Sequence, residues 1–384
     1  MLTESPLQFR FTLFILRCRE CPVNAPAIIH RSRNADLTMD NRLQLLTRWV
    51  RQIPGFSAAS PTPVSGDASF RRYFRVWKDV PGGQLAPFIV MDAPPEHEDC
   101  VPFVAIARHW HQHGIAVPAI AAEDLEQGFL LLEDLGNLLM LTALEQGDVD
   151  TLYRAALDEL ARIAGLDDPA DYPLPAYDQA LLDREMALFP DWLLEKHLGL
   201  ELDNQERALL DTAFGLLRES ALAQPEVTVH RDYHSRNLLV RDSQTVPGVI
   251  DFQDAVRGPI TYDAVSLLKD CYVRWPEQRL ASWLEHFRNA SQQAGLHRAD
   301  ADTFRQWFEL MGMQRHLKAA GIFARLAIRD GKTGYLADIP RTVSYLRDAS
   351  ARQPAFRHFH EWLCSTVIPA IEQRIGPLPE PGVR

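Results

Sequence analysis

The sequence has few cysteines, no long hydrophobic run and no excess of positive charge. Its five cysteines are an odd number scattered over 384 residues, so they form no disulfide framework, and we expect a reducing cytoplasm. Cys18 and Cys21 form a C-x-x-C pair with no second pair of metal ligands, which we interpret as incidental. No run of about twenty apolar residues occurs, so no membrane partner is expected. The net charge of −11 argues against a nucleic-acid partner, and nothing in the sequence indicates an obligate protein partner.

The segment 1–38 differs from the rest of the chain. A short apolar stretch, 11–16, lies between two arginines, but it is shorter than the core of a secretory signal, and only a poor cleavage site follows it. Met39 then opens an amphipathic segment. We therefore hypothesise that the native chain begins at Met39 and that residues 1–38 are a disordered or non-native extension.

Hydrophobic periodicity divides the remaining sequence into two parts. Strands are expected at 70–76, 88–91 and 129–132, and helices at 41–52, 101–113, 150–166, 177–198, 203–222, 263–275, 277–293, 301–329, 339–346 and 355–375. These three strands precede residue 137, two short β-like runs follow at 237–240 and 246–250, and most of the helices also follow residue 137. We therefore expect an α+β fold of two lobes, a small β-rich N-lobe over 39–136 and a larger, mostly helical C-lobe over 137–384.

One short stretch of the helical half carries a catalytic pattern. His230-Arg231-Asp232 is followed after four residues by Asn237, and two β-like runs later comes Ile250-Asp251-Phe252. This is the arrangement of a kinase catalytic loop and its metal-binding aspartate. The whole set is too specific to be a solvated turn that carries the motif by chance.

Phosphoryl transfer needs the residue types that this pattern supplies. The reaction requires a group that takes the proton of an attacking hydroxyl, and we assign this role to Asp232. It also requires cations on the phosphate oxygens, and Mg²⁺ prefers oxygen ligands such as those of Asn237 and Asp251. We expect His230 and Arg231 to brace the loop.

The protein-kinase set is otherwise incomplete, because the sequence has no G-x-G-x-x-G, no V-A-I-K and no A-P-E. The chain instead resembles the aminoglycoside phosphotransferase and choline kinase-like family over about residues 40–375. The residues that carry the resemblance are 131–136, 230–237, 250–252, Gly258-Pro259 and Tyr262-Asp263. It implies a protein-kinase-like two-lobe fold, ATP as phosphate donor and Mg²⁺ as cofactor.

Three further stretches narrow the resemblance: 66–75, 90–95 and 251–255. They are similar to the bacterial kinases that phosphorylate the anomeric C1 hydroxyl of N-acetylmuramate and N-acetylglucosamine in peptidoglycan recycling. This similarity implies an amino sugar and ATP as the small-molecule partners. An anomeric hydroxyl is also more acidic than an ordinary alcohol, so a carboxylate can deprotonate it more readily.

The nucleotide is expected to bind the N-lobe. The loop before the first predicted strand, including Ser69, would lie above the phosphates, and the backbone at Glu133 and Leu135 would form the hinge that reads adenine. The third-strand lysine of the family is missing from 88–92. We hypothesise that an arginine replaces it, with Arg75 chosen from the cluster Arg71, Arg72 and Arg75.

The acceptor residues are the least determined by the sequence. His234, Arg236 and Asp254 are the candidates for substrate contact, although the first two could brace the loop and Asp254 could support the metal site. Arg274 or Arg315 could pair with the carboxylate of a muramate. An aminoglycoside or choline-type kinase and a nucleotide-binding pseudokinase scaffold stay open as alternatives, although a scaffold needs neither a base nor metal ligands.

Overall fold

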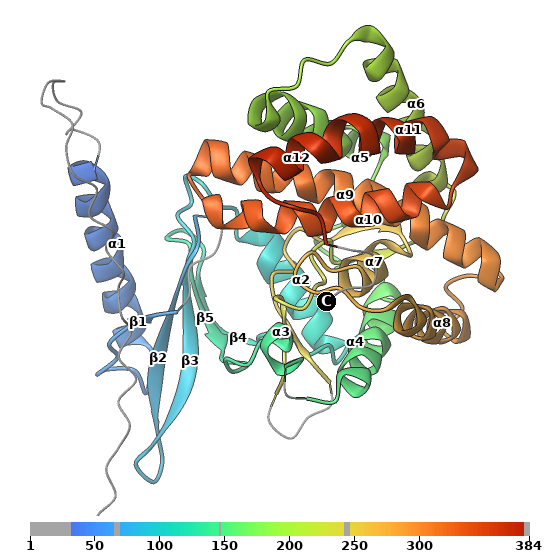
Figure 1. Ribbon diagram of the computed structural model, residues 1–384. Coiled ribbons are helices and arrows are strands. Elements are labelled where there is room, and N and C mark those ends of the chain that lie inside the picture. Colours follow the sequence, from blue (N-terminus) through green and yellow to red (C-terminus); the bar gives the residue numbers. More distant parts are fainter. Residues whose placement is uncertain (1–31, 65–69, 146, 242–245, 380–384) are drawn as a thin grey trace, which may run out of the picture. The chain divides into compact units, whose positions relative to one another are not determined.

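The structure, a computed structural model, describes residues 32–64, 70–145, 147–241 and 246–379 (Figure 1). The chain divides at Trp49 into two units, which are described separately. The first unit contributes most of helix α1 (Ser32–Gln52), in which the Thr47 hydroxyl donates to the carbonyl of Leu43 at 2.7 Å. The helix begins before Met39, and the hypothesis about the native start stays a prediction.

A five-stranded antiparallel sheet opens the second unit. Its order is β1-β2-β3-β5-β4, with the strands β1 (Thr62–Pro63), β2 (Arg72–Val80), β3 (Gln84–Asp92), β4 (Ile120–Asp124) and β5 (Phe129–Glu133). The three expected strands are confirmed as β2, β3 and β5, whereas β1 and β4 were not predicted. Burial explains the difference, because Phe74 and Val76 alternate with more exposed residues along β2, while β4 has no buried position.

Helix α2 (Val101–Gln112) connects this sheet to the catalytic segment. Its apolar face buries Phe103, Ile106 and Trp110. The rings of Phe103 and Trp110 contact the ring of Phe252, with centroid distances of 4.8 and 5.6 Å. Helix α2 therefore fixes the position of the residue next to Asp251.

The second part of this unit is helical, which confirms the expected two-part α+β fold. Its helices are α3 (Met140–Ala143), α4 (Val149–Ala164), α5 (Gln179–Leu188), η1 (Phe189–Leu198), α6 (Asn204–Leu222), α7 (Tyr262–Leu268), α8 (Glu277–Gln293), α9 (Ala301–Asp330), η2 (Thr333–Asp338), α10 (Ile339–Ala351), η3 (Pro354–Phe356), α11 (Arg357–Trp362), η4 (Leu363–Val367) and α12 (Ile368–Arg374). The lobe boundary expected at residue 136 falls between β5 and α3 and stays a prediction.

Helix α9 is the central element of the helical part. It is 30 residues long and packs against α5, η1, α6, α7 and α10, as the side-by-side orange and red ribbons of Figure 1 illustrate for α9 and α10. Gly321 permits this close packing, because a Cβ there would lie 2.3 Å from the carbonyl carbon of Leu188. The position therefore excludes any larger residue.

Three predicted helices differ from the structure, and each difference has a local cause. The helix expected over 263–275 ends at Leu268, because the Asp270 carboxylate accepts from the backbone N–H of Tyr272 at 3.0 Å. The helix expected over 177–198 changes to a wider π-helical segment where Pro190 enters. The one expected over 355–375 breaks into η3, α11, η4 and α12, with Pro369 after the π-helical part. Proline lacks the N–H that a regular helix requires.

Two small ribbons present the catalytic loops. Strand β6 (Glu226–Val229) pairs with β9 (Val256–Pro259), and β7 (Leu238–Leu239) pairs with β8 (Gly248–Val249). The loop 230–237 connects the end of β6 to the start of β7, and Asp251 follows the end of β8, the strand that pairs with β7. The catalytic loop and Asp251 therefore both lie next to the β7–β8 ribbon.

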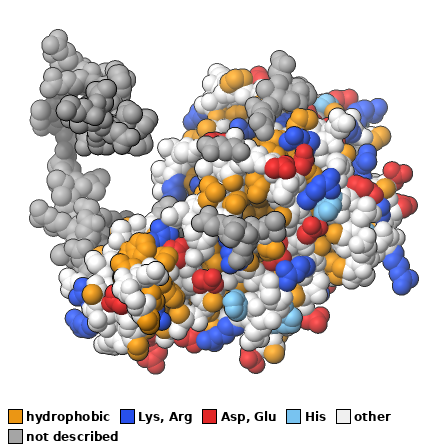
Figure 2. Space-filling model, turned by 90° about the horizontal axis from the view of Figure 1, so that it is seen from below, with side chains coloured by type: hydrophobic (Ala, Val, Ile, Leu, Met, Phe, Trp, Pro, Cys, Tyr) orange, Lys and Arg blue, Asp and Glu red, His pale blue; other side chains and the backbone are white. Residues whose placement is uncertain are grey.

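Neither the visible surface nor the described helices indicate a nucleic-acid or membrane partner. Charged side chains of both signs are interspersed over the described part of the face in Figure 2, so no broad basic surface is visible there. Among the described residues, no helix is both long enough and apolar enough to span a bilayer.

Candidate active site

His230 fixes the beginning of the catalytic loop. Its side chain is fully buried, Nδ1 accepts from the backbone N–H of Asp232 at 3.2 Å, and Nε2 donates to the carbonyl of Ile250 at 3.0 Å. Burial lowers the pKa of His230 to about 4, so the ring is neutral and can make both bonds. His230 therefore ties the loop to the residue before Asp251.

Asp263 of helix α7 also fixes the catalytic loop. Its carboxylate accepts from the backbone N–H groups of His230 and Arg231, at 2.6 and 3.0 Å. Burial raises the pKa of Asp263 to about 7, although both hydrogen bonds favour the charged form. The bonds hold Arg231 in a left-handed backbone conformation, with φ of 77°, and this turn places Asp232 at the cavity.

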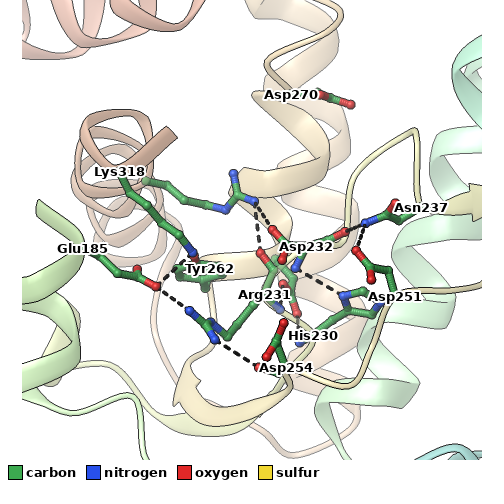
Figure 3. A network of polar contacts seen from close by, with 12 residues as sticks. Glu185, His230, Arg231, Asp232, Asn237, Asp251, Asp254, Tyr262, Asp270 and Lys318 are labelled. Atoms are coloured by element: carbon green, nitrogen blue, oxygen red, sulfur yellow. Dashed lines mark hydrogen bonds and ion pairs between the residues drawn. The ribbon is translucent and has the colours of Figure 1, made fainter. Parts of the chain in front are cut away.

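Asp232, Asn237 and Asp251 converge on one wall of a cavity of about 530 Å³ (Figure 3). The Asn237 amide donates to the carbonyl of Asp232 at 3.0 Å and to the Asp251 carboxylate at 3.3 Å. Gln253 donates to the other oxygen of Asp251 at 3.0 Å. The three predicted residues are thus brought together.

This donor set fits a magnesium ion. With Nδ2 of Asn237 turned to its two acceptors, Oδ1 is the atom that could ligate a cation, next to the Asp251 carboxylate. Within the described ranges, no group of three or more His, Cys, Asp or Glu side chains could hold a metal ion. A pair of side-chain oxygens suits Mg²⁺ in particular, because that ion takes its remaining ligands from phosphate and water.

Cations surround the Asp232 carboxylate, whose side chain is 40% exposed. Burial disfavours its charge, but Lys318 and Arg315 outweigh this effect and lower the pKa of Asp232 to about 2. Arg315 lies 3.8 Å from Oδ1 of Asp232. The carboxylate is therefore ionised at neutral pH and can accept a proton.

Glu185 connects Arg231 of the catalytic loop to Lys318 of helix α9. Its carboxylate pairs with Arg231 at 2.6 Å and with Lys318 at 3.0 Å, and Lys318 also donates to the Tyr262 hydroxyl at 2.8 Å (Figure 3). Burial opposes the charge of Glu185, but the two cations lower its pKa. Glu185 and Lys318 are buried and Arg231 is partly buried, and the network holds α5, the loop and α9 together.

The end of the cavity at which a nucleotide is expected, called the nucleotide end here, is formed by the sheet and the segment after it. It is lined by Val64, Tyr73, Arg75, Ile89, Leu132, Glu133, Asp134, Leu135, Gly136, Asn137, Leu139, Leu239 and Ile250. The N–H of Glu133 donates to Ala119 at 2.8 Å. The carbonyl of Glu133 and the N–H of Leu135 are therefore the hinge groups that could read a base. Ser69 lies outside the described residues.

The three arginines that precede or occupy β2 have different partners. Arg72 pairs with Asp92, its cross-strand neighbour on β3. Arg75 donates to the Asp134 carboxylate at 2.5 Å, so it lines the hinge and not the metal site. Arg71 pairs with Glu98 at 3.3 Å and lies 4.0 Å from the Asp251 carboxylate, with 10% of its side chain exposed. Arg71 is thus the cluster member at the metal site.

The remaining cavity lining, where the acceptor is expected and which we call the acceptor end, comes from the catalytic loop and the helical part. Its lining residues are His234, Arg236, Asp270, Cys271, Tyr272, Arg315, Lys318, Ala319, Ile322, Phe323, Leu326 and Tyr335. The structure brings His234 and Arg236 here as expected. Asp254 does not line the cavity and is exposed, and in the described part of the chain its carboxylate accepts a long bond from Gln253, at 3.4 Å. Arg274 bonds to Ser344 and Asp348, also outside the cavity lining.

Sequence reasoning missed several of these residues. Asp270, Tyr272 and Tyr335 come from segments that carry no motif, and Lys318 and Glu185 lie within regular helical patterns. Only Asp263 had a signal, since it belongs to the stretch that carries the family resemblance. In the sequence of an amphipathic helix, a buried Lys or Glu cannot be distinguished from the exposed Lys and Glu residues of the polar face.

Comparisons with known proteins agree with this geometry. The phosphotransferase enzyme family matches residues 60–302. An N-acetylmuramate/N-acetylglucosamine kinase of Pseudomonas putida is 45% identical over 336 residues, covering 84% of this chain and 96% of the relative. A protein of the same name from Neisseria meningitidis is 40% identical over 311 residues, covering 80% of this chain and 90% of the relative.

Solved structures of kinases share the fold. An ethanolamine kinase of Plasmodium vivax superimposes with a TM-score of 0.59 at 11% identity, covering 85% of this chain and 91% of that one. A choline/ethanolamine kinase family protein from Mesorhizobium loti gives a TM-score of 0.56 at 14% identity, covering 86% and 99%. At these identities the likeness concerns the fold alone, and it confirms the expected two-lobe kinase fold.

Proposed function

Since the chain belongs to the phosphotransferase enzyme family, we propose that it transfers the terminal phosphate of ATP to the anomeric C1 hydroxyl of N-acetylmuramate and N-acetylglucosamine. The observation that carries the proposal is the convergence of Asp232, Asn237 and Asp251 on one cavity wall, in a chain 45% identical to a kinase of these sugars. A phosphotransferase with a sugar hydroxyl as acceptor needs this set of groups.

The residues have separate roles in the proposed reaction. Asp232 accepts the proton of the C1 hydroxyl. The C1 oxygen of the sugar bonds to the terminal phosphorus, and the bond between this phosphorus and ADP breaks. Asn237 and Asp251 would hold Mg²⁺, which when bound neutralises charge on the phosphate oxygens. Arg71, fixed by Glu98 next to Asp251, is in position to hold the phosphates in place of the missing lysine.

The electrostatics of Asp232 suit an anomeric acceptor. A carboxylate whose pKa is lowered to about 2 is always ionised near neutrality, but it is a weak base. Proton transfer to a weak base is easier from a more acidic hydroxyl, and the C1 hydroxyl of a sugar is more acidic than an ordinary alcohol.

The acceptor end disfavours the alternative substrates. Arg315 and Lys318 line it beside their partners Asp232 and Glu185. Arg236 lines it with no ion pair within 4.0 Å in the described residues, so its charge would repel a polycationic aminoglycoside or a quaternary ammonium group.

The convergence of Asp232, Asn237 and Asp251 argues against a pseudokinase, because a scaffold needs neither a base nor metal ligands. ATP as donor agrees with the expected cytoplasmic location, and the expectations of no nucleic-acid and no obligate protein partner stay predictions.

An ATP-consumption assay tests the proposal. N-acetylmuramate, N-acetylglucosamine, glucose, choline and kanamycin are compared in the presence of Mg²⁺, and the product is examined by ³¹P and ¹³C NMR. We expect turnover with the two N-acetylated sugars and phosphate on C1. Turnover with kanamycin or choline alone, or phosphate on another hydroxyl, would contradict it.

A further inference from the structure

We propose that Arg236, stacked on Tyr272 and Tyr335 at the acceptor end, binds the carboxylate of N-acetylmuramate and thereby favours this anionic sugar over neutral N-acetylglucosamine. This inference rests on the proposed function and names the residue that separates its two substrates. The two sugars differ at the lactyl ether, which carries a negative charge in the first and is absent from the second.

The position of Arg236 suits carboxylate binding. Its guanidinium carbon lies 4.7 Å from the ring centroid of Tyr272 and 5.9 Å from that of Tyr335. A cation–π contact holds a guanidinium near the rings without using its N–H donors. These donors match the two oxygens of a carboxylate in a bidentate pair. Arg236 also directly precedes Asn237 in the catalytic loop, so a sugar at Asp232 lies within its reach.

The neighbouring acids do not neutralise Arg236. In the described part of the chain, no carboxylate lies within 4.0 Å of its guanidinium. Asp270 is occupied by Ser235, whose N–H and hydroxyl donate to it at 3.0 and 2.5 Å, and by the N–H of Tyr272. Asp338 lies 3.5 Å from Arg341. The charge of Arg236 therefore remains available for a ligand.

The other cations of the acceptor end are already engaged. Lys318 is held by Glu185 and Tyr262. Arg315 donates to the carbonyl of Arg231 at 3.1 Å and lies 3.8 Å from Asp232, so it serves the catalytic loop. Among the described cations that line this end, Arg236 is the one that forms no ion pair within 4.0 Å, although it lies near enough to Asp338 to favour the charge of that carboxylate.

The matched pair of substrates gives a direct test. For the Arg236→Gln variant, we expect kcat/KM with N-acetylmuramate to fall about 10- to 100-fold, because a charge-assisted bidentate contact is lost. The fall with N-acetylglucosamine should be much smaller. The methyl ester of N-acetylmuramate, which lacks the charge, should be used about equally by the variant and the wild type.

Two further variants control for folding and for the aromatic stack. Arg279 lies over Trp275 and Trp283, at 5.4 and 6.0 Å from the ring centroids, but does not line the cavity. Arg279→Gln should therefore leave kcat/KM unchanged for both sugars. Arg236→Lys keeps the charge without the planar fork, and it should restore part of the preference for N-acetylmuramate.

The possible outcomes separate the inference from the function on which it rests. An equal fall with both sugars in Arg236→Gln and Arg236→Lys, or no fall with either sugar, would overturn the role of Arg236 while the kinase assignment stands. A wild-type enzyme that phosphorylates neither sugar would overturn the proposed function itself. Thermal unfolding of each variant shows whether a loss of activity reflects a loss of fold.

Discussion

The two ends of the cavity are built in different ways. The nucleotide end is formed by strands β2, β3 and β5 and the segment after Glu133, which we propose reads a base through its backbone groups. The acceptor end is formed by side chains from the catalytic loop, the segment after α7, helix α9 and η2, and several of them are charged. A common donor can thus be bound by backbone geometry, whereas the choice of acceptor depends on a few side chains.

The difference extends to what holds each end together. The nucleotide end relies mainly on a continuous antiparallel ladder and a buried apolar face, to which the pairs of Arg72 with Asp92 and Arg75 with Asp134 are added. The acceptor end relies more on buried ion pairs, among them Glu185 with Lys318 and Lys269 with Glu309. We therefore expect charge-removing substitutions and acid to affect the acceptor end first.

The largest effect is expected where the two ends meet. Asp232→Asn removes the proton acceptor, so kcat should fall by about 10²- to 10⁴-fold. The affinity for ATP, measured by calorimetry without sugar, should change little because the hinge contacts remain. Unchanged turnover in this variant would refute the catalytic assignment.

The buried network under the loop should come next. Glu185→Gln leaves Arg231 and Lys318 without their shared carboxylate, and removing one partner of a buried pair costs about 3–5 kcal/mol of the free energy of unfolding. Denaturant titration measures this loss.

The matched control for this variant is Glu195→Gln, whose ion pair with Arg207 at 2.7 Å is partly exposed. It should cost less than about 1 kcal/mol. Equal losses for the two variants would mean that the buried network does not hold the acceptor end.

Arg71 is expected to have a smaller effect, on the nucleotide side. Arg71→Gln should lower kcat/KM for ATP by about 10- to 100-fold, because a charged contact to the phosphates is lost. Lys78→Gln, at the far end of β2, is the control and should have no effect. If Lys78 and not Arg71 proved necessary, the missing lysine would have been replaced from the other end of the strand.

The smallest effect concerns acid. Burial opposes the charge of Glu309, but Lys269 and Arg352 outweigh it and lower the pKa from 4.5 to about 2. The pairs therefore stabilise the fold above pH 4.5, and this contribution is lost as the pH falls toward 2. We expect a loss of about 2 kcal/mol between pH 4.5 and about pH 3 that Glu309→Gln does not show.

Hydrogen exchange at acidic pH locates this loss in the molecule. Protection should decline in α9 before it declines in β2, β3 and β5, because Glu309 lies on α9. The opposite order would break the contrast between the two ends.

The same contrast explains what the sequence could predict. The strands β2, β3 and β5 have strong apolar or alternating patterns, and the catalytic residues from His230 to Asn237 lie in one short stretch, so both could be identified. Tyr272 and Tyr335 come from separate irregular or short segments, and only the fold brings them to Arg236. The helix expected over 263–275 failed because a side chain, Asp270, bonds the backbone that the helix would have used.

The left-handed turns at Arg231 and Asp251 have a consequence for how this enzyme can change. Their φ angles of 77° and 66° suit glycine, and an ordinary side chain in that conformation costs about 1–2 kcal/mol. Glycine at Asp251 would relieve this cost while removing a group that phosphoryl transfer requires, whereas glycine at Arg231 would also break the buried pair with Glu185. Selection for thermal endurance alone would therefore erode turnover at Asp251, and engineering for robustness should leave both positions untouched.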